Sequence, residues 1–421
     1  MSNIPKLRFP EFSGEWEEKK LNSIFTKITQ RNSDNQNSNV ITNSATEGLV
    51  SQRDYFDKDI ANKDKTDNYF IIKNGDFVYN PRKSSAAPYG PFTQYKLLDD
   101  GIVSPLYLCL RKNNSEVESK YLENYFKTTC WHQYIYENGS SGARHDRVSI
   151  HDDVLLAMPI KVPSLPEQQK IADFLSNVDS IITAETKILN TLQKKKKALM
   201  QKLFTRQLRF KSADGTDFPT WEEKKFSEVF IYHQTNTFSR NMLNYEEGDT
   251  YNIHYGDILV KFGSYIDFDN SKIPFINSDV TLNKFVSDSF LKDGDIIIAD
   301  TAEDESAGKV SEVYNINNKK ALSGLHTILC RPKQIFASKY LGYFMNSNVY
   351  HKQIVKLLVG TKVLSINKSV IADTIIQIPC LAEQQKIADC LSSLDSLIQT
   401  QQNVVTTWQQ RKKALLQQMF V

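Results

Sequence analysis

Apolar residues recur every three to four positions in two long segments of the chain, residues 164–204 and 380–420. The first apolar stripe consists of Ile171, Leu175, Val178, Ile182, Leu189, Leu192, Leu199 and Leu203. The second stripe consists of Ile387, Leu391, Leu394, Ile398, Val405, Trp408, Leu415 and Met419. A spacing of 3.5 residues sustained over about four to five heptads predicts a coiled coil.

Two amphipathic helices packed separately on their own domains are the alternative interpretation of these stripes. However, both stripes are interrupted by polar residues at the same two places. The interrupting residues are Glu185 and Lys196 in the first stripe, and Gln401 and Lys412 in the second. Matching interruptions favour two helices that pack on each other.

The two segments are copies of one sequence. With an offset of 216 positions, 21 of 41 aligned residues are identical. The first copy continues with "LRF" at 208–210 and "WEEKK" at 221–225, whereas the second copy ends with the chain. The same two motifs occur at the N-terminus, at 7–9 and 16–20. The chain therefore reads as a circularly permuted tandem duplication, which predicts pseudo-twofold symmetry and neighbouring N- and C-termini.

The start of the first long helix is predicted at "SLPE", residues 164–167. Ser164 and Glu167 have the spacing of a capping box, and Pro166 suits the first helical turn. The second copy has Cys380 in place of Ser164, which predicts a weaker cap.

The segments between the repeated parts share landmarks rather than overall sequence. "NGDFVYN" at 74–80 corresponds to "DGDIIIAD" at 293–300, and each predicts a turn followed by a strand. The other matching landmarks are "GIVSPLYLCLR" with "ALSGLHTILCR", two "SKYL" helix starts, and strand-like "LLAMPIKVP" with "IIQIPC". Each segment is therefore predicted to be a mixed α/β domain built on one plan.

The predicted fold class is α+β, with two similar mixed α/β domains joined by two long helices that form an antiparallel coiled coil. The predicted divisions are an N-terminal conserved segment (1–20), a first domain (21–163), a central conserved region with the first helix (164–226), a second domain (227–379) and a C-terminal conserved helix (380–421). The copies agree in their helices and differ in their domains. This organisation suits recognition of two different targets at a fixed separation.

Composition is that of a globular protein, with 40% hydrophobic and 24% charged residues and a net charge of only +3. A DNA-binding surface would therefore have to be local, because there is no overall basic excess. No run of 18 apolar residues predicts a membrane span, and the N-terminus lacks the pattern of a cleaved signal. The five cysteines form no CxxC pair, so a reducing cytoplasm is expected.

Motifs for catalysis are missing from the sequence. "NPRK" at Asn80 resembles the start of an adenine methyltransferase motif but lacks its second proline and its aromatic residue, so a turn after a strand is predicted. There is no GxxxxGK[ST] phosphate loop, and the seven histidines form no metal-ligand pair. The acidic stretch 299–309 has no nuclease spacing and is interpreted as a solvated loop.

Each domain has one glycine-containing loop between a predicted helix and a predicted strand. The loop is "GSSGARHDRVSI" in the first domain and "VGTKVLSI" in the second. The candidate DNA-binding residues of the loops are Arg144, His145 and Arg147 in the first domain and Thr361 and Lys362 in the second. Arg82 and Lys83, after the predicted strand at 74–80 of the first domain, are further candidates. Arginine pairs bidentately with guanine, whereas Lys83 and Lys362 would hold phosphates, which position the protein without specifying sequence. From chemistry alone, ordinary solvated loops are an equal alternative.

The organisation resembles the specificity (S) subunit of Type I restriction-modification systems. The resemblance rests on "LPEQQKIADFLSNVDSII" (165–182), "LAEQQKIADCLSSLDSLI" (381–398), the two "WEEKK" motifs and "YNIHYGDI" (251–258). It implies that the two variable domains are target recognition domains, each reading one half of a bipartite, asymmetric DNA site. It also implies that the two helices space these domains and dock methyltransferase subunits.

The resemblance further implies a non-catalytic chain with no cofactor of its own. S-adenosylmethionine would be bound by two modification subunits, and ATP with Mg²⁺ by the restriction subunits that translocate and cleave DNA. The implied partners are thus double-stranded DNA and these subunits, with no membrane. The rival interpretation is a non-DNA scaffold with two ligand-binding domains on a coiled-coil spacer, which the near-neutral charge leaves open. An autonomous methyltransferase is disfavoured by the missing motifs.

Overall fold

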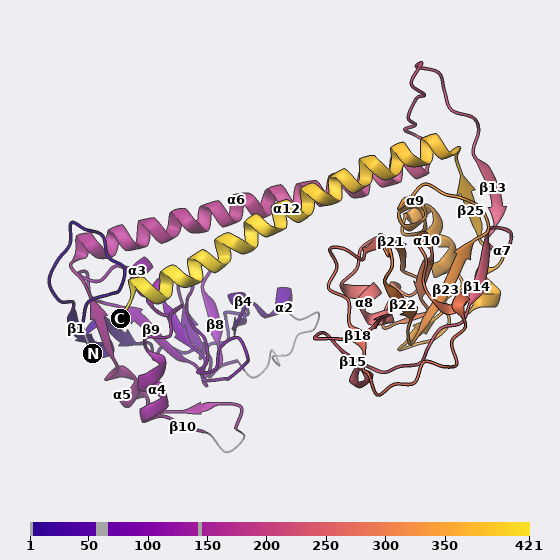
Figure 1. The fold of residues 1–421 in the computed structure, drawn as a ribbon. Helices are drawn as coiled ribbons and strands as arrows, with labels where there is room; N and C mark the ends of the chain where they lie inside the picture. Colours follow the sequence, from indigo (N-terminus) through magenta and orange to yellow (C-terminus); the bar gives the residue numbers. More distant parts are fainter. Residues whose placement is uncertain (1–2, 56–65, 142–144) are drawn as a thin grey trace. The chain divides into compact units, whose positions relative to one another are not determined.

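The computed structural model describes residues 3–55, 66–141 and 145–421. The chain divides into two compact units. Unit 1 comprises residues 1–186 and 403–421, and unit 2 comprises residues 187–402. Each unit thus contains one of the two segments that lie between the repeated parts and about half of each long helix, and both ends of the chain lie in unit 1 (Figure 1).

Unit 1 is built on a four-stranded antiparallel sheet. Its strand order is β2 (Phe25–Lys27), β9 (Leu108–Lys112), β6 (Phe77–Tyr79) and β7 (Phe92–Gln94). The smaller strand pairs are β3 (Ile41–Ser44) with β4 (Gly48–Ser51), β5 (Phe70–Ile72) with β8 (Gly101–Val103), and β10 (Ser140–Ser141) with β11 (Val148–Ser149). The short helices are α1 (Leu21–Ile24), α2 (Gln52–Tyr55), α3 (Ser119–Tyr125), α4 (His132–Asn138) and α5 (Asp152–Leu156).

An aromatic core holds the sheet of unit 1 against its helices. The Phe92 and Phe126 rings stack with centroids 3.8 Å apart, and Phe77 and Trp131 meet them edge-on. Each of these rings is at most 6% exposed. Burial of rings this large supplies several kcal/mol apiece, so β6 is fixed firmly in the centre of the unit.

Unit 2 has a larger, mixed sheet. Its strand order is β14 (Phe230–His233), β23 (Thr327–Pro332), β19 (Ile296–Ala299), β21 (Val310–Tyr314) and β17 (Tyr265–Asp267). A second sheet runs β15 (Leu243–Asn244), β18 (Phe275–Ile276), β16 (Thr250–Ile253) and β22 (Lys320–Ser323), and β20 (Thr301–Ala302) pairs with β24 (Leu364–Ser365). The helices are α7 (Phe226–Val229), α8 (Tyr255–Val260), α9 (Tyr340–Met345), α10 (Asn348–Val355) and α11 (Lys368–Ile371), with 3₁₀ turns η2 (Arg240–Met242) and η3 (Ser287–Ser289).

The two long helices are α6 (Leu165–Phe204) and α12 (Leu381–Met419). Within unit 1, Leu175 near the start of α6 shares a buried core with Leu416 near the end of α12. Within unit 2, Leu203 near the end of α6 shares a core with Leu391 near the start of α12. The helices therefore pair in antiparallel fashion in each unit, and the predicted coiled coil is confirmed (Figure 1).

The two lysines that interrupt the apolar stripes form ion pairs between the helices. The Lys196 ammonium binds Asp395 at 2.5 Å in unit 2, and the Lys412 ammonium binds Asp179 at 2.5 Å in unit 1. These pairs are related by the same offset of 216 positions as the sequence copies. The lysines thus stay in the seam because an acid on the facing helix neutralises each of them.

The N-terminus completes unit 1 in the way that the internal repeat predicts. Strand β1 (Glu17–Lys20) pairs with β12 (Pro159–Val162), and β13 (Glu222–Lys225) pairs with β25 (Ile375–Ile378) in the same antiparallel arrangement. The Leu7 amide also donates to the carbonyl of Gln418 at 2.9 Å. The two ends of the chain are therefore neighbours, and the circular repeat closes as expected.

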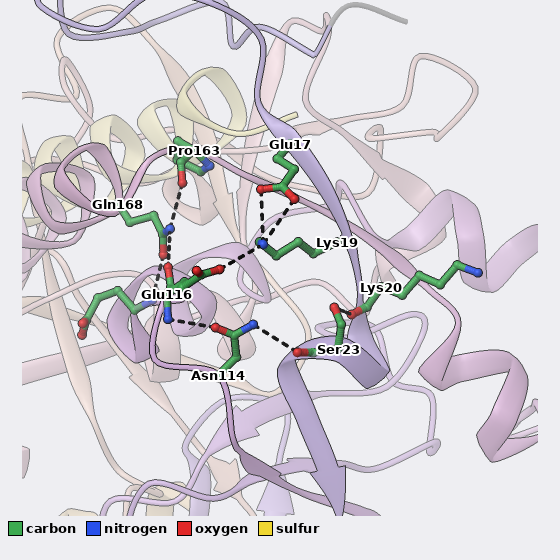
Figure 2. Close-up of polar contacts among 9 residues, drawn as sticks. Glu17, Lys19, Lys20, Ser23, Asn114, Glu116, Pro163 and Gln168 are labelled. Atoms are coloured by element: carbon green, nitrogen blue, oxygen red, sulfur yellow. Dashed lines mark hydrogen bonds and ion pairs between the residues drawn. The ribbon is translucent and has the colours of Figure 1, made fainter.

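Gln168, in the repeated "EQQKIAD" motif, ties α6 to the neighbouring loops (Figure 2). Its side-chain amide donates to the carbonyls of Glu116 and Pro163 at 3.0 and 2.8 Å. Beside it, Lys19 of β1 forms ion pairs with Glu17 and Glu116. Gln384 makes the matching bond to the carbonyl of Pro379 at 2.8 Å, so the motif is conserved between copies for a structural reason.

The predicted capping box is wrong in its use of Glu167. Helix α6 does begin at Leu165, next to Ser164. The Glu167 carboxylate, however, accepts hydrogen bonds from Arg8 and from the Trp16 indole at 2.8 and 3.3 Å. A more distant arginine outcompetes the local backbone because a charged bidentate partner binds a carboxylate more strongly than one amide.

Across the described part of the chain, no helix combines the length and apolarity needed to cross a membrane.

Candidate nucleic-acid interface

The loop residues predicted in unit 1 lie on two adjacent chain segments beyond the end of β6. Arg82 and Arg147 form an antiparallel bridge. On either side of it, the Lys83 amide donates to the Asp146 carbonyl at 2.8 Å and the Val148 amide donates to the Pro81 carbonyl at 2.9 Å. The structure therefore brings Arg82, Lys83 and Arg147 together, although about 65 positions of sequence separate them.

His145 precedes this bridge on the same loop. Its side chain is exposed and its φ is +54°, in the left-handed region. Few residues other than glycine, asparagine, aspartate and histidine adopt this conformation readily. Arg144, the remaining candidate of this loop, lies outside the described residues.

The "NPRK" motif forms a turn that positions Arg82. The Asn80 side chain accepts a hydrogen bond from the Arg82 amide at 3.0 Å and donates one to the Asn43 carbonyl at 3.1 Å. Gly90 has a φ of +83°, and a Cβ there would lie 2.0 Å from the Asn80 carbonyl oxygen. The turn thus depends on close backbone packing against Gly90. Within it, the Asn80 side chain links the Arg82 backbone to the Asn43 backbone.

A surface groove of about 310 Å³ lies beside this bridge. Pro81, Leu106 and Val148 contribute apolar walls, and Arg147 lines it with a side chain that is 37% exposed. The Arg147 guanidinium is 3.9 Å from the Asp146 carboxylate. It is therefore only loosely held and can reach outward for a planar acceptor such as a guanine edge.

In unit 2 the predicted residues Thr361 and Lys362 are exposed at the tip of a tight turn. Val359 and Ser365 exchange backbone hydrogen bonds of 3.0 and 2.9 Å at its base. Gly360 has a φ of +130°, and a Cβ there would lie 2.0 Å from the Val363 carbonyl oxygen. The turn is therefore rigid at its base and presents its two candidates to solvent.

This turn is anchored to β20. In the chain, β20 directly follows β19, the central strand of the main sheet of unit 2. Strand β24 pairs with β20, and the Thr301 hydroxyl donates to the Leu364 carbonyl at 3.2 Å. In unit 1 the bridge between Arg82 and Arg147 also lies just beyond the central strand β6. Both candidate loops thus rest on the same part of their scaffold.

Two residues that the sequence did not single out lie at the base of the unit 2 turn. Nδ1 of His326 is 3.2 Å from an Asp300 carboxylate oxygen. Asp300 belongs to the acidic stretch interpreted from sequence as a solvated loop, yet its side chain is only 28% exposed. Burial raises the pKa of the Asp300 carboxyl, and the neighbouring His326 and Lys368 oppose that shift. Only the aligned strand landmarks could have drawn attention to it.

Two arginines of the main sheets are committed to the scaffold. Arg111 binds the buried carboxylate of Asp76 through bonds of 2.8 and 2.7 Å. Arg331 binds Asp295 in the same way, at 2.8 and 2.7 Å. These pairs fix the start of β6 and β19, at the opposite end of each strand from the candidate loops.

The family model "Type I restriction modification DNA specificity domain" matches residues 13–194 and 219–407. The chain belongs to this family. One curated relative is the Type I restriction enzyme MjaVIII specificity subunit of Methanocaldococcus jannaschii, with 26% identity over 75% of this chain and 72% of the relative. The putative MjaX specificity subunit of the same organism is 24% identical over 98% of this chain and 95% of the relative. This membership supports a specificity-subunit function and gives no support to a non-DNA scaffold.

Solved structures share the fold. A chain from a study of complex assembly and conformational transition of the type I R-M system matches with a TM-score of 0.57 and 16% identity, over 96% of this chain and 97% of that one. The S subunit from M. genitalium matches with a TM-score of 0.50 and 14% identity, over 99% of both chains. The α+β architecture with two domains and long spacer helices is thus that of the family.

Proposed function

We propose that each unit reads one half of a bipartite, asymmetric site on double-stranded DNA. One observation carries the proposal: the units repeat their structural contacts, whereas their loops differ. Arg8–Glu167 corresponds to Arg209–Glu383. The loops, by contrast, differ: unit 1 carries Arg82 and Arg147, whereas unit 2 carries Thr361 and Lys362. A duplicated scaffold that carries two different loops suits the recognition of two different half-sites.

We further propose that the paired helices bind two modification (methyltransferase) subunits and that restriction subunits join the assembly. S-adenosylmethionine would be bound by the modification subunits, and ATP with Mg²⁺ by the restriction subunits. The chain itself would be non-catalytic and cytoplasmic. All five of its cysteines are free, which fits a reducing compartment.

The half-site assignment is tested by changing one loop at a time. Arg147→Ala is expected to weaken or relax recognition of one half-site only, by about 1–3 kcal/mol if the guanidinium is bidentate to guanine. Lys362→Ala is expected to weaken binding through the other half only, with a smaller salt dependence because a phosphate contact is lost. The readout is methylome sequencing of strains carrying each variant, with salt-dependent DNA binding by the reconstituted complex.

Matched controls are lysines held by ion pairs elsewhere on each unit. Lys96 binds Glu123 in unit 1 and Lys319 binds Asp269 in unit 2. Alanine at either position should leave both half-sites unchanged. Equal loss on both halves after Arg147→Ala would refute the assignment of one half-site to each unit.

The non-catalytic assignment needs a separate experiment. The pure chain, incubated with DNA and labelled S-adenosylmethionine, should transfer no methyl groups above background. The same chain mixed with its modification subunits should methylate DNA at two short sequences separated by an unread spacer. Incorporation by the pure chain would contradict the proposal.

A further inference from the structure

The Asp300–His326 pair occupies a defined place in the sheet of unit 2. Strands β19 and β23 pair in antiparallel register, ending with Ala299 opposite Thr327. Asp300 and His326 are the next two residues across from each other, and the Asp300 amide donates to the His326 carbonyl at 3.1 Å. The pair thus continues the register of β19 and β23 by one residue beyond the last paired residues of these strands.

His326 is held in an unusual conformation at this point. Its φ is +53°, in the left-handed region, and its side chain is 51% exposed. The Tyr255 ring packs edge-on against the imidazole with centroids 5.4 Å apart. Left-handed backbone in a residue other than glycine is strained and is often found at functional sites. Here it turns the imidazole onto the Asp300 carboxylate.

The same place in unit 1 carries different chemistry. Strand β6 pairs with β9 in the same register, with Phe77 opposite Leu110 where unit 2 has Ile296 opposite Cys330. Counting on from these pairs, Pro81 and Leu106 stand where unit 2 has Asp300 and His326. Pro81 and Leu106 are apolar and line the groove beside Arg147. The two units therefore present an apolar pair and a hydrogen-bonding pair at one equivalent position.

Asp300 also lies against the candidate recognition turn of unit 2. The Ile366 amide donates to the Asp300 carbonyl at 2.8 Å, directly after the turn that carries Thr361 and Lys362. In unit 1 the matching segment bridges Arg82 to Arg147. A carboxylate at this place would face DNA together with the turn, and His326 and Lys368 partly balance its charge.

We infer that Asp300, oriented by His326, accepts a hydrogen bond from the exocyclic amino group of one base in the half-site read by unit 2. Carboxylates are rare near phosphates but are suited to cytosine N4, and adenine N6 offers the same kind of donor in the major groove. In this role Asp300 is a specificity-determining residue and His326 a positioning residue. The inference rests on the proposed function, because it concerns the same DNA site.

The test uses the full chain assembled with its modification subunits and a DNA library randomised at each position of both half-sites. Asp300→Asn should broaden the preference at one position, because an amide also donates to the keto oxygens of thymine and guanine. The preferred base should lose roughly 5- to 150-fold in discrimination. The base whose preference is lost distinguishes cytosine from adenine.

His326→Asn is the second variant, because asparagine tolerates the left-handed backbone. It should relax the same base position as Asp300→Asn, whereas a residue with only a structural role would lower the melting temperature and leave the preference intact. Asp269→Asn, which removes another surface carboxylate of unit 2, is the control and should change neither half-site.

The outcomes separate the inference from the proposed function. If Asp300→Asn leaves every base preference unchanged, or alters the half-site read by unit 1, the inference is overturned while the bipartite site stands. If the wild-type assembly shows no two-part preference, the proposed function itself fails.

Discussion

The guanidinium of Arg8 donates two hydrogen bonds of 2.8 Å to the buried carboxylate of Glu167, although 159 positions separate the two residues. Arg209 and Glu383 repeat this contact in unit 2, at 3.0 and 2.7 Å. In each unit a tryptophan indole, Trp16 or Trp221, donates to the same carboxylate. The glutamate of the repeated "EQQKIAD" motif therefore fastens the segment that precedes each recognition domain.

Removal of Arg8 should destabilise unit 1 selectively. Arg8→Ala leaves the Glu167 carboxylate buried without its charged partner, which costs roughly 3–5 kcal/mol. Hydrogen exchange of β1 and β12 should rise, while β13 and β25 in unit 2 keep their protection. Arg209→Ala should give the reverse pattern. Lys170→Ala, which breaks an exposed ion pair with Glu11, is the control and should cost about 0–1 kcal/mol.

The chain should tolerate circular permutation within the internal copy of its N-terminal segment. The turn around Asp214 and Gly215 is exposed, and the existing ends are neighbours through the bond from Leu7 to Gln418. A chain opened between Asp214 and Gly215, with its old ends joined by a short Gly-Ser linker, should fold and assemble with partner subunits. A chain opened inside the buried β6 should not. Failure of the first permutant, measured by sizing chromatography, would count against the circular repeat.

A charge in the apolar seam should separate the long helices. Leu391 is fully buried between α12 and α6, so Leu391→Asp should cost several kcal/mol. Leu397 lies on the same helix but is 55% exposed. Leu397→Asp should therefore leave the melting temperature nearly unchanged. Similar melting temperatures for the two variants would contradict the paired-helix arrangement, and the melting curve of Leu175→Asp offers an independent check in unit 1.

Unit 2 should lose stability as the pH rises through neutrality. Glu312 is buried, and burial raises the pKa of its carboxyl to about 7 despite hydrogen bonds from the amides of Lys339 and Gly342. A carboxyl with a raised folded-state pKa binds its proton more tightly in the folded state. Its contribution is therefore complete below pH 4.5 and is lost as the pH passes about 7. The loss is roughly 3 kcal/mol.

Glu312→Gln removes this titration. Thermal unfolding at pH 5 and pH 8 should show a larger drop in the wild type than in the variant. An equal drop in both proteins would mean that another group sets the pH dependence.

The sequence by itself determined the repeat, the helix pairing and the family. These features are recorded locally: the apolar stripe of α6 and α12 follows from a 3.5-residue period, and the closure of unit 1 by "LRF" and "WEEKK" follows from matching letters. Even the polar breaks at Lys196 and Lys412 could be located from the pattern. Their partners, Asp395 and Asp179, could not, because the facing residue depends on the register between the helices.

Only the tertiary structure decided which residues meet. Asp300 reaches His326 because β19 and β23 leave their sheet in a fixed register. Arg82 meets Arg147 because the segment after β6 runs antiparallel to the segment before β11. The spacing of Glu167 predicts a helix cap, yet its carboxylate binds Arg8 because the folded chain places a guanidinium there. Spacing along a chain reports which residues share a helix or strand face, but contacts between distant segments depend on how whole elements pack. The candidate DNA interface is made of such contacts. Its residues could therefore be proposed from the sequence, but which of them lie close together could not.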